Sequence, residues 1–254
     1  MRSNNPNNNE TEECRLYQKI GSCRHGERCN RKHHIPNFSK TILLPNLYPN
    51  PSLQLKDRVS SSINRELQTH LETFYEDIFL KLMEYGEIDE LMVAENLSSH
   101  LVGNTYVRFV SDLGAARAFR ALNHRFYNGA LLKPEFSPVV NFSNTRCRQN
   151  DRGREGCFRG HSCNFLHIRD PSQSLLNKLF RIQREYYDKL YEKRKQFEKE
   201  KRKSNIKENE NNLENLNEKD ISINQNEEEY ENENQIDEKK TTQGQLMKIE
   251  NSQK

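Results

Sequence analysis

Two groups of cysteines and a histidine have the residue types and the spacing to hold metal ions. The chain has 254 residues and six cysteines, and the two groups use all six, three in each. Thiolate and imidazole groups bind zinc, and four of them complete its tetrahedral shell. The first group, spaced C-x8-C-x5-C-x3-H, consists of Cys14, Cys23, Cys29 and His33. The second, spaced C-x9-C-x5-C-x3-H, consists of Cys147, Cys157, Cys163 and His167.

These groups predict two structural zinc ions (Zn2+). His34 adjoins His33, but the x3 spacing favours His33 as the ligand. A complete shell leaves no open position for water or substrate, so the pattern predicts a protein that is not an enzyme. A segment this short has almost no core of its own. Zinc binding, on the order of 10–16 kcal/mol in zinc-finger peptides, would therefore supply most of its folding energy.

Basic residues surround both groups. They form either a solvated basic surface or a face that contacts phosphates and bases, and their repetition in both groups favours the second interpretation. Phe165 lies between Cys163 and His167, where it either packs beside the metal or stacks on a base. The basic residues are Arg15, Lys19, Arg24, Arg28, Arg31 and Lys32 in the first group, and Arg146, Arg148, Arg152, Arg154 and Arg159 in the second.

The elements that must position these groups centre on the stretch from Val102 to Phe109. It alternates apolar and polar residues, as a strand does, and resembles the octamer of an RNA-recognition motif (RRM). However, Val102 stands where that motif has a basic residue, and Asn104 stands where it has the first stacking aromatic. In the expected partner strand, Leu43 replaces the second stacking ring. The sequence therefore predicts an RRM whose sheet is not built to bind RNA.

Hydrophobic periodicity extends the RRM pattern on both sides of this stretch. We expect strands over 39–48, 87–94, 101–110 and 131–136, and helices over 64–85 and from Ser111 or Asp112 to Asn123. The dipeptide Asn128-Gly129 predicts a turn. The order β-α-β-β-α-β is the ferredoxin-like α+β plan of an RRM. A further helix is expected from Ser172 to about Lys203.

Composition divides the chain into a folded part and two polar ends. Only 33% of the residues are hydrophobic, 30% are charged, and the mean hydropathy is −1.07. Residues 171–203 carry 11 basic and 5 acidic residues, whereas residues 204–254 carry 6 and 13. The basic segment is a nucleic-acid contact, a nuclear-import signal or only a solvated helix. If its partner is a nucleic acid, the acidic tail is a candidate competitor for that partner. No segment is apolar enough for a signal peptide or a membrane span, so a reducing compartment is expected.

We therefore divide the chain into six predicted segments. A disordered leader over 1–13 precedes the first CCCH zinc finger over 14–36. The RRM over 37–140 is followed by the second CCCH finger over 141–170. A basic helix over 171–203 leads to a disordered, acidic, Asn-rich tail over 204–254.

Two CCCH fingers flanking a degenerate RRM resemble the small subunit of the U2 auxiliary factor, a splicing-factor family of the nucleus. The resemblance covers about residues 14–180. Local matches lie at Lys19–Cys29, Asp77–Glu87, His100–Asn104, Ser137–Val139 and Cys163–His167. Three features depart from the family pattern: Leu16 replaces an aromatic residue, the second finger has x9 spacing, and an Arg-Ser-rich tail is missing.

The resemblance implies a role for each finger and for the RRM. The fingers would bind the AG dinucleotide at the 3′ splice site of pre-mRNA, with contacts from Arg24, Asn30 and Arg31, and from Arg148, Asn164 and Phe165. The basic surface around the ligands adds Arg28 and Arg159 to the predicted RNA contacts. The RRM would be of the UHM type, which binds a Trp-containing peptide of the large subunit to form a heterodimer. Its contacts would be Glu72, Glu76 and Asp77 on the first helix and the loop Arg125, Phe126 and Tyr127. The alternative is a CCCH regulator of mRNA decay or translation that binds AU-rich RNA, which would leave a peptide-binding RRM unexplained.

Overall fold

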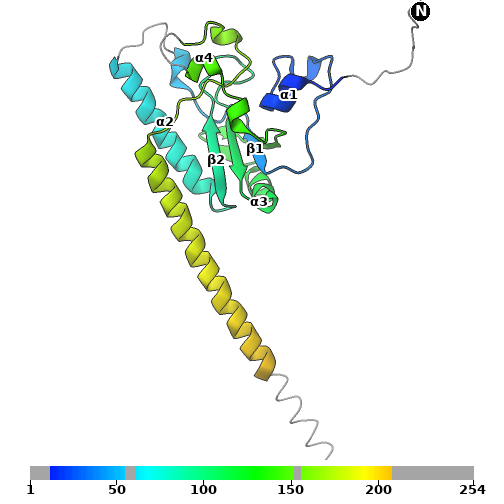
Figure 1. Ribbon diagram of the computed structural model, residues 1–254, viewed down its shortest axis with the longest axis vertical. Helices are drawn as coiled ribbons and strands as arrows, with labels where there is room; N and C mark the ends of the chain where they lie inside the picture. Colours follow the sequence, from blue (N-terminus) through cyan, green and yellow to red (C-terminus); the bar gives the residue numbers. More distant parts are fainter. Residues whose placement is uncertain (1–11, 55–60, 152–155, 208–254) are drawn as a thin grey trace, which may run out of the picture. The chain divides into compact units, whose positions relative to one another are not determined.

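The computed structural model describes residues 12–54, 61–151 and 156–207. Its centre is a four-stranded antiparallel sheet in the order β2-β3-β1-β6. The strands are β1 (Thr41–Leu44), β2 (Ile88–Val93), β3 (Thr105–Phe109) and β6 (Glu135–Phe136). Helices α2 (Ser61–Leu82) and α3 (Asp112–Leu122) complete the β-α-β-β-α-β order (Figure 1). The predicted ferredoxin-like RRM is confirmed.

Both helices bury one apolar face against the same side of the sheet. On α2 this face includes Leu71, Phe74 and Phe79, which join Ile42 and Val107 of the sheet in one core. Helix α3 begins at Asp112 because Ser111 caps it, with the Ser111 hydroxyl accepting a hydrogen bond from the backbone N–H of Gly114. Such a cap stabilises a helix by about 1 kcal/mol. These helices fix one side of the RRM and leave the other side to the zinc fingers.

The strand predicted over 131–136 is wrong, because the chain there divides into two short strands. Residues Ala130–Leu131 form β5, which pairs with β4 (Phe126–Tyr127) in a separate hairpin. Its turn, Asn128-Gly129, has φ angles of 46° and 78°, as a tight hairpin turn requires. Pro134 then interrupts the chain before β6, because proline has no N–H to donate to a ladder.

The strand predicted over 101–110 is shorter than expected and begins at Thr105. The residues before it form a turn in which Gly103 has a φ of +66° and lies against the backbone of Tyr48. Any larger side chain at Gly103 would collide with the Tyr48 carbonyl oxygen. This turn ends the alternation that made residues 101–104 resemble a strand.

The second face of the sheet is buried rather than open. Leu43, Met92 and Tyr106 are aligned across β1, β2 and β3 on this face, and each is at most 4% exposed. They pack against residues of both fingers and of the segment after β6. Those residues are Ile20, Val139, Phe142, Leu166 and Ile168.

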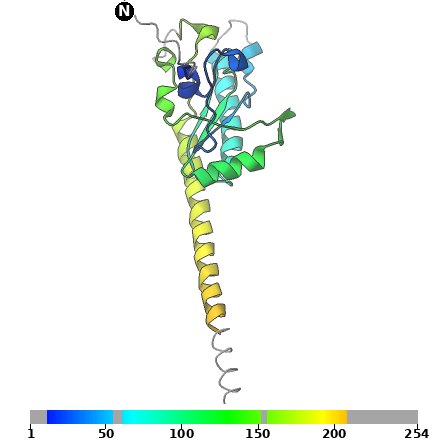
Figure 2. The same ribbon diagram turned by 90° about the vertical axis from the view of Figure 1, so that its right-hand side faces the viewer.

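The described part of the chain forms two compact units, one that ends at Tyr187 and one that begins at Asp188. Within the first unit, a helix begins at residue 173, and its Leu175 and Leu179 join the core formed by α2. Gln183 is 3% exposed and bonds both the N–H and the carbonyl of Ile88 at 2.9 Å. In the second unit, residues 188–207 are helical, so the helix extends beyond the predicted end at Lys203 (Figure 2).

Two of the predicted segments lie largely outside the described residues. These are the leader over 1–13, of which only 12 and 13 are described, and the tail over 204–254 beyond residue 207. Among the described helices, none combines the length and the apolar character that a membrane span requires.

Candidate metal centres and nucleic-acid interface

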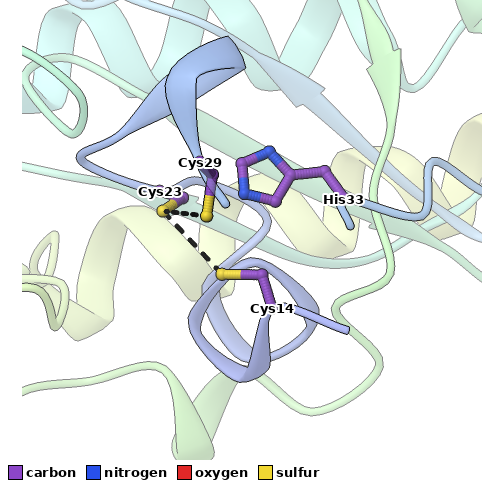
Figure 3. A group of neighbouring side chains, drawn as sticks. All are labelled: Cys14, Cys23, Cys29 and His33. Atoms are coloured by element: carbon purple, nitrogen blue, oxygen red, sulfur yellow. Dashed lines mark hydrogen bonds between the residues drawn. The ribbon is translucent and has the colours of Figure 1, made fainter. Parts of the chain in front are cut away.

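The first Cys/His group comes together as a metal site. The ligand atoms of Cys14, Cys23, Cys29 and His33 all lie within 4.8 Å of one another (Figure 3). The Cys23 sulfur is 3.8 Å from that of Cys14 and 4.0 Å from that of Cys29. A tetrahedral zinc ion with Zn–S bonds of 2.3 Å holds two sulfurs about 3.8 Å apart. Nε2 of His33 is buried without a hydrogen-bond partner, as expected of an atom that binds a metal.

The second group repeats this arrangement. The ligand atoms of Cys147, Cys157, Cys163 and His167 lie within 4.8 Å of one another, with the Cys147 and Cys163 sulfurs 3.7 Å apart. Nε2 of His167 is likewise buried without a partner. Burial lowers the pKa of His167, which favours the neutral imidazole that a metal requires. Both groups fit structural zinc.

The same local backbone positions the ligands in both fingers. A 3-10 turn precedes the third cysteine in each, Gly26–Arg28 in the first and Gly160–Ser162 in the second. The N–H of the first cysteine donates to the carbonyl of the residue before the histidine, at 2.9 Å in the first finger and 2.8 Å in the second. The x9 spacing therefore leaves these contacts of the second finger unchanged. Residues 152–155, in its longer loop, lie outside the described part of the chain.

The two fingers are joined directly through Arg24. Its Nε donates to Oδ1 of Asn164 at 2.9 Å, and its Nη2 donates to the carbonyl of Ser162 at 2.6 Å. Arg24 and Asn164 were both predicted to contact RNA from separate fingers. The structure brings them together at one junction, so the fingers present a joint surface.

A cavity of about 380 Å³ lies beside this junction in the second finger. Three of the residues predicted to contact RNA line it: Arg148, Arg159 and Phe165. The Lys19 ammonium of the first finger lies 4.9 Å from the centre of the Phe165 ring. Phe158 also lines the cavity and is 78% exposed. The remaining lining residues are Ser143, Asn144, Arg146, Cys147, Gln149, Cys157 and Cys163.

Sequence reasoning missed the contribution of Phe158 to this cavity. The signal was an aromatic residue directly after a zinc ligand, in a segment with no other apolar side chain nearby. Conversely, Arg28, Asn30 and Arg31 are exposed and do not line the cavity. Arg31 forms an ion pair with Glu12 at 3.7 Å.

A second cavity, of about 580 Å³, lies on the RRM between α2, α3 and the β4–β5 hairpin. Its walls include Asp77 and the predicted loop of Arg125, Phe126 and Tyr127. The Tyr127 hydroxyl donates to Oδ2 of Asp77 at 2.8 Å, which joins the hairpin to α2. The aliphatic part of the wall consists of Leu44, Leu47, Ile78, Leu82, Ala121, Leu122 and Leu132.

The other two predicted acidic residues of α2 do not line this cavity. Glu72 accepts hydrogen bonds from Gln68 and from the backbone N–H of Ser172, both at 2.8 Å, and these bonds lower its pKa. Glu76 pairs with Lys178 at 2.6 Å. The expected acidic patch is therefore divided between the cavity, at Asp77, and the contact with residues 172–178.

Comparison with known proteins agrees with this arrangement of fingers and RRM. Residues 9–35 match the family model "Zinc finger C-x8-C-x5-C-x3-H type (and similar)". The "Splicing factor U2AF 23 kDa subunit" of Schizosaccharomyces pombe is 46% identical over 173 residues, 68% of this chain and 78% of the relative. The "Splicing factor U2AF 26 kDa subunit" of Homo sapiens is 45% identical over 171 residues, covering 66% and 77%. The "Splicing factor U2af 38 kDa subunit" of Drosophila melanogaster is 42% identical over 173 residues, covering 66% and 65%. With its two CCCH zinc sites and the RRM between them, the chain belongs to the family of U2AF small-subunit splicing factors.

Proposed function

We propose that the chain is the small subunit of a nuclear heterodimer in which the fingers bind the AG at the 3′ splice site and the RRM binds the large subunit. The observation that carries this proposal is the burial of the sheet face at Leu43 and Tyr106, which are 3% and 0% exposed. An RRM that binds RNA stacks bases on that face. With that face covered, the fingers offer the basic and aromatic groups that RNA requires, and the RRM is left for another partner.

The cavity beside the finger junction supports single-stranded RNA as the ligand. Arg148, Arg159 and Lys19 supply positive charge for phosphates, and Phe158 and Phe165 supply rings for bases. Stacking of a base on such a ring contributes about 1–3 kcal/mol. Phosphate contacts fix the position of the strand, and base contacts specify its sequence.

The RRM cavity supports a peptide with a large aromatic side chain as the partner. Its walls are mainly apolar, and Phe126 at its edge is 70% exposed. Exposed aromatic residues beside an apolar cavity are typical of binding sites for proteins. Asp77 and Arg125 place one charge of each sign at the walls, which favours a peptide with charged flanks.

The RNA part is tested with the full chain loaded with two zinc ions. Its affinity for short RNAs that contain UAG, UCG or AU repeats is measured by fluorescence anisotropy. We expect UAG to bind about tenfold more tightly than UCG, since one well-placed base contact contributes about 1–3 kcal/mol. A preference for AU repeats without discrimination at AG would instead support a regulator of mRNA decay or translation.

The partner part is tested separately by titration with a Trp-containing peptide from the large subunit. We expect binding that is retained when RNA is absent, because the two cavities have no wall residue in common. Absence of peptide binding by the zinc-loaded chain would contradict the heterodimer.

A further inference from the structure

Asn96 is a buried side chain that joins the RRM to the second finger. It follows β2 and is 1% exposed. Its Nδ2 donates to the carbonyl of Phe165 at 3.0 Å, and its Oδ1 accepts from the backbone N–H of His167 at 2.8 Å. Next to it, the N–H of Glu95 donates to the carbonyl of His167 at 2.8 Å. Ala94 also forms an antiparallel bridge with Ile168, so the Asn96 amide continues the pairing of the segment after β2 with the end of the second finger.

The backbone hydrogen bonds of residues 165–167 go alternately to the RRM and to the finger. Leu166, between the two residues held by Asn96, accepts from the N–H of Cys147 at 2.8 Å and donates to the carbonyl of Thr145 at 2.9 Å. Its side chain is fully buried in the cluster on the sheet face. The segment is thus bonded on one side to the finger's first zinc ligand and on the other to the RRM.

This short segment and the residue before it carry three of the groups on which the second finger's proposed binding surface depends. Asn164, directly before it, accepts the hydrogen bond from Arg24 of the first finger. Phe165 lines the cavity beneath Lys19. His167 is a zinc ligand. A shift of the segment would therefore move the finger junction, the stacking ring and a metal ligand together.

We infer that Asn96 is a positioning residue through which the RRM sets the orientation of the second finger for RNA binding. This inference rests on the proposed function of the fingers. Asn96 acts through the backbone of Phe165 and His167 rather than by touching RNA. Without its side chain, one N–H and one carbonyl lose their partners, and an unpaired buried backbone group is costly enough to favour rearrangement.

The test compares N96A with N50A in the full, zinc-loaded chain. Asn50 is a matched control because it is 4% exposed and its side chain also bonds two backbone groups, the carbonyl of Glu95 and the N–H of Ser52, both at 2.9 Å. Both of these hydrogen bonds lie within the RRM, and one of them reaches the same loop as Asn96. We expect N96A, but not N50A, to speed amide hydrogen exchange at His167 and to weaken binding of UAG RNA, each by about tenfold.

The isosteric variant N96D separates positioning from folding. It keeps an acceptor for the N–H of His167 but replaces the donor to Phe165 with an oxygen. We expect wild-type exchange at His167 and RNA binding weakened by about threefold or more, since the Phe165 carbonyl then faces a carboxylate. If N96A does not fold, N96D alone decides: weaker binding than N50A supports the inference, and wild-type binding overturns it.

Two outcomes keep this inference distinct from the proposed function. If the wild-type chain shows no preference for UAG, the proposed function fails, and exchange at His167 together with the rate of zinc release from the second finger still tests Asn96. If N96A matches N50A in exchange, zinc release and RNA binding, Asn96 has no positioning role.

Discussion

Arg24 of the first finger donates a hydrogen bond from Nε to Oδ1 of Asn164 in the second finger, over 2.9 Å. The two residues are 140 positions apart in the sequence, on opposite sides of the RRM. Arg24 also donates to the Ser162 carbonyl. Each finger has little core of its own, and these two bonds join the fingers into one surface. Binding at one finger is therefore expected to depend on the other.

The first prediction concerns this bond. R24A and N164A should each weaken RNA binding, and the double variant should lose less than the two effects added together. The expected coupling is about 0.5–3 kcal/mol, because the two side chains are in direct contact. RNA titrations of the four proteins give this value. R28A removes an exposed cation from the same finger, and full additivity between R28A and N164A provides the control; additivity between R24A and N164A would show that the bond contributes nothing.

The second prediction concerns the metal. C29S or C163S should release one zinc ion per chain, unfold its own finger and sharply weaken RNA binding, because zinc supplies most of the folding energy of so small a unit. Metal content by mass spectrometry and RNA titration measure both effects. H34A is the matched control, since His34 adjoins a ligand but lies outside the cluster. Two zinc ions retained by C29S would contradict the ligand assignment.

The third prediction concerns the RRM cavity. F126A should weaken binding of the Trp-containing peptide by about tenfold or more, because an exposed aromatic residue that a partner covers often contributes about 2 kcal/mol or more. Binding of UAG RNA should not change. F38A is the control, since Phe38 is 72% exposed and does not line the cavity. Equal loss of peptide affinity in both variants would place the docking site elsewhere.

The fourth prediction concerns pH. Burial raises the pKa of Glu135, which lies beside Leu43 in the sheet. A carboxyl group with a raised folded-state pKa favours folding below its unfolded pKa, and this contribution is lost as pH rises through the folded value. E135Q should therefore be more stable than the wild type near neutral pH, by a margin that shrinks as the pH falls.

Urea unfolding at several pH values, with zinc present, measures the margin. E66Q is the control, since Glu66 is exposed on α2. A margin for E135Q that is the same at every pH would contradict the role assigned to burial.

Local sequence patterns predicted the zinc sites and most of the RRM. Cysteine spacing is fixed by ligand geometry, and the apolar face of α2 follows from helical periodicity, so both could be read from short segments. The pattern predicts only half of the β4–β5 hairpin: Asn128-Gly129 marks its turn, but the apolar pattern after the turn continues across Pro134. Pro134 ends that pattern as a strand, because proline has no N–H to donate to a ladder.

Contacts between distant segments could not be predicted in this way. Nothing near Leu43 indicates that Ile20 of the first finger covers it. Nothing near Glu76 indicates that Lys178, 102 positions away, neutralises it. Such contacts depend on how the fingers and the C-terminal helix pack on the RRM. The roles of individual residues in RNA and peptide binding remain predictions for the same reason.

Photo-crosslinking of UAG RNA to the zinc-loaded chain tests the central claim most directly. The claim is that the fingers bind RNA while the sheet face of the RRM stays buried beneath them. Crosslinked residues are identified by mass spectrometry. Crosslinks at Phe158, Phe165 and the first finger, with none in β1 or β3, are the predicted result. Crosslinks mainly at Leu43 or Tyr106, retained after zinc is removed, would contradict the account.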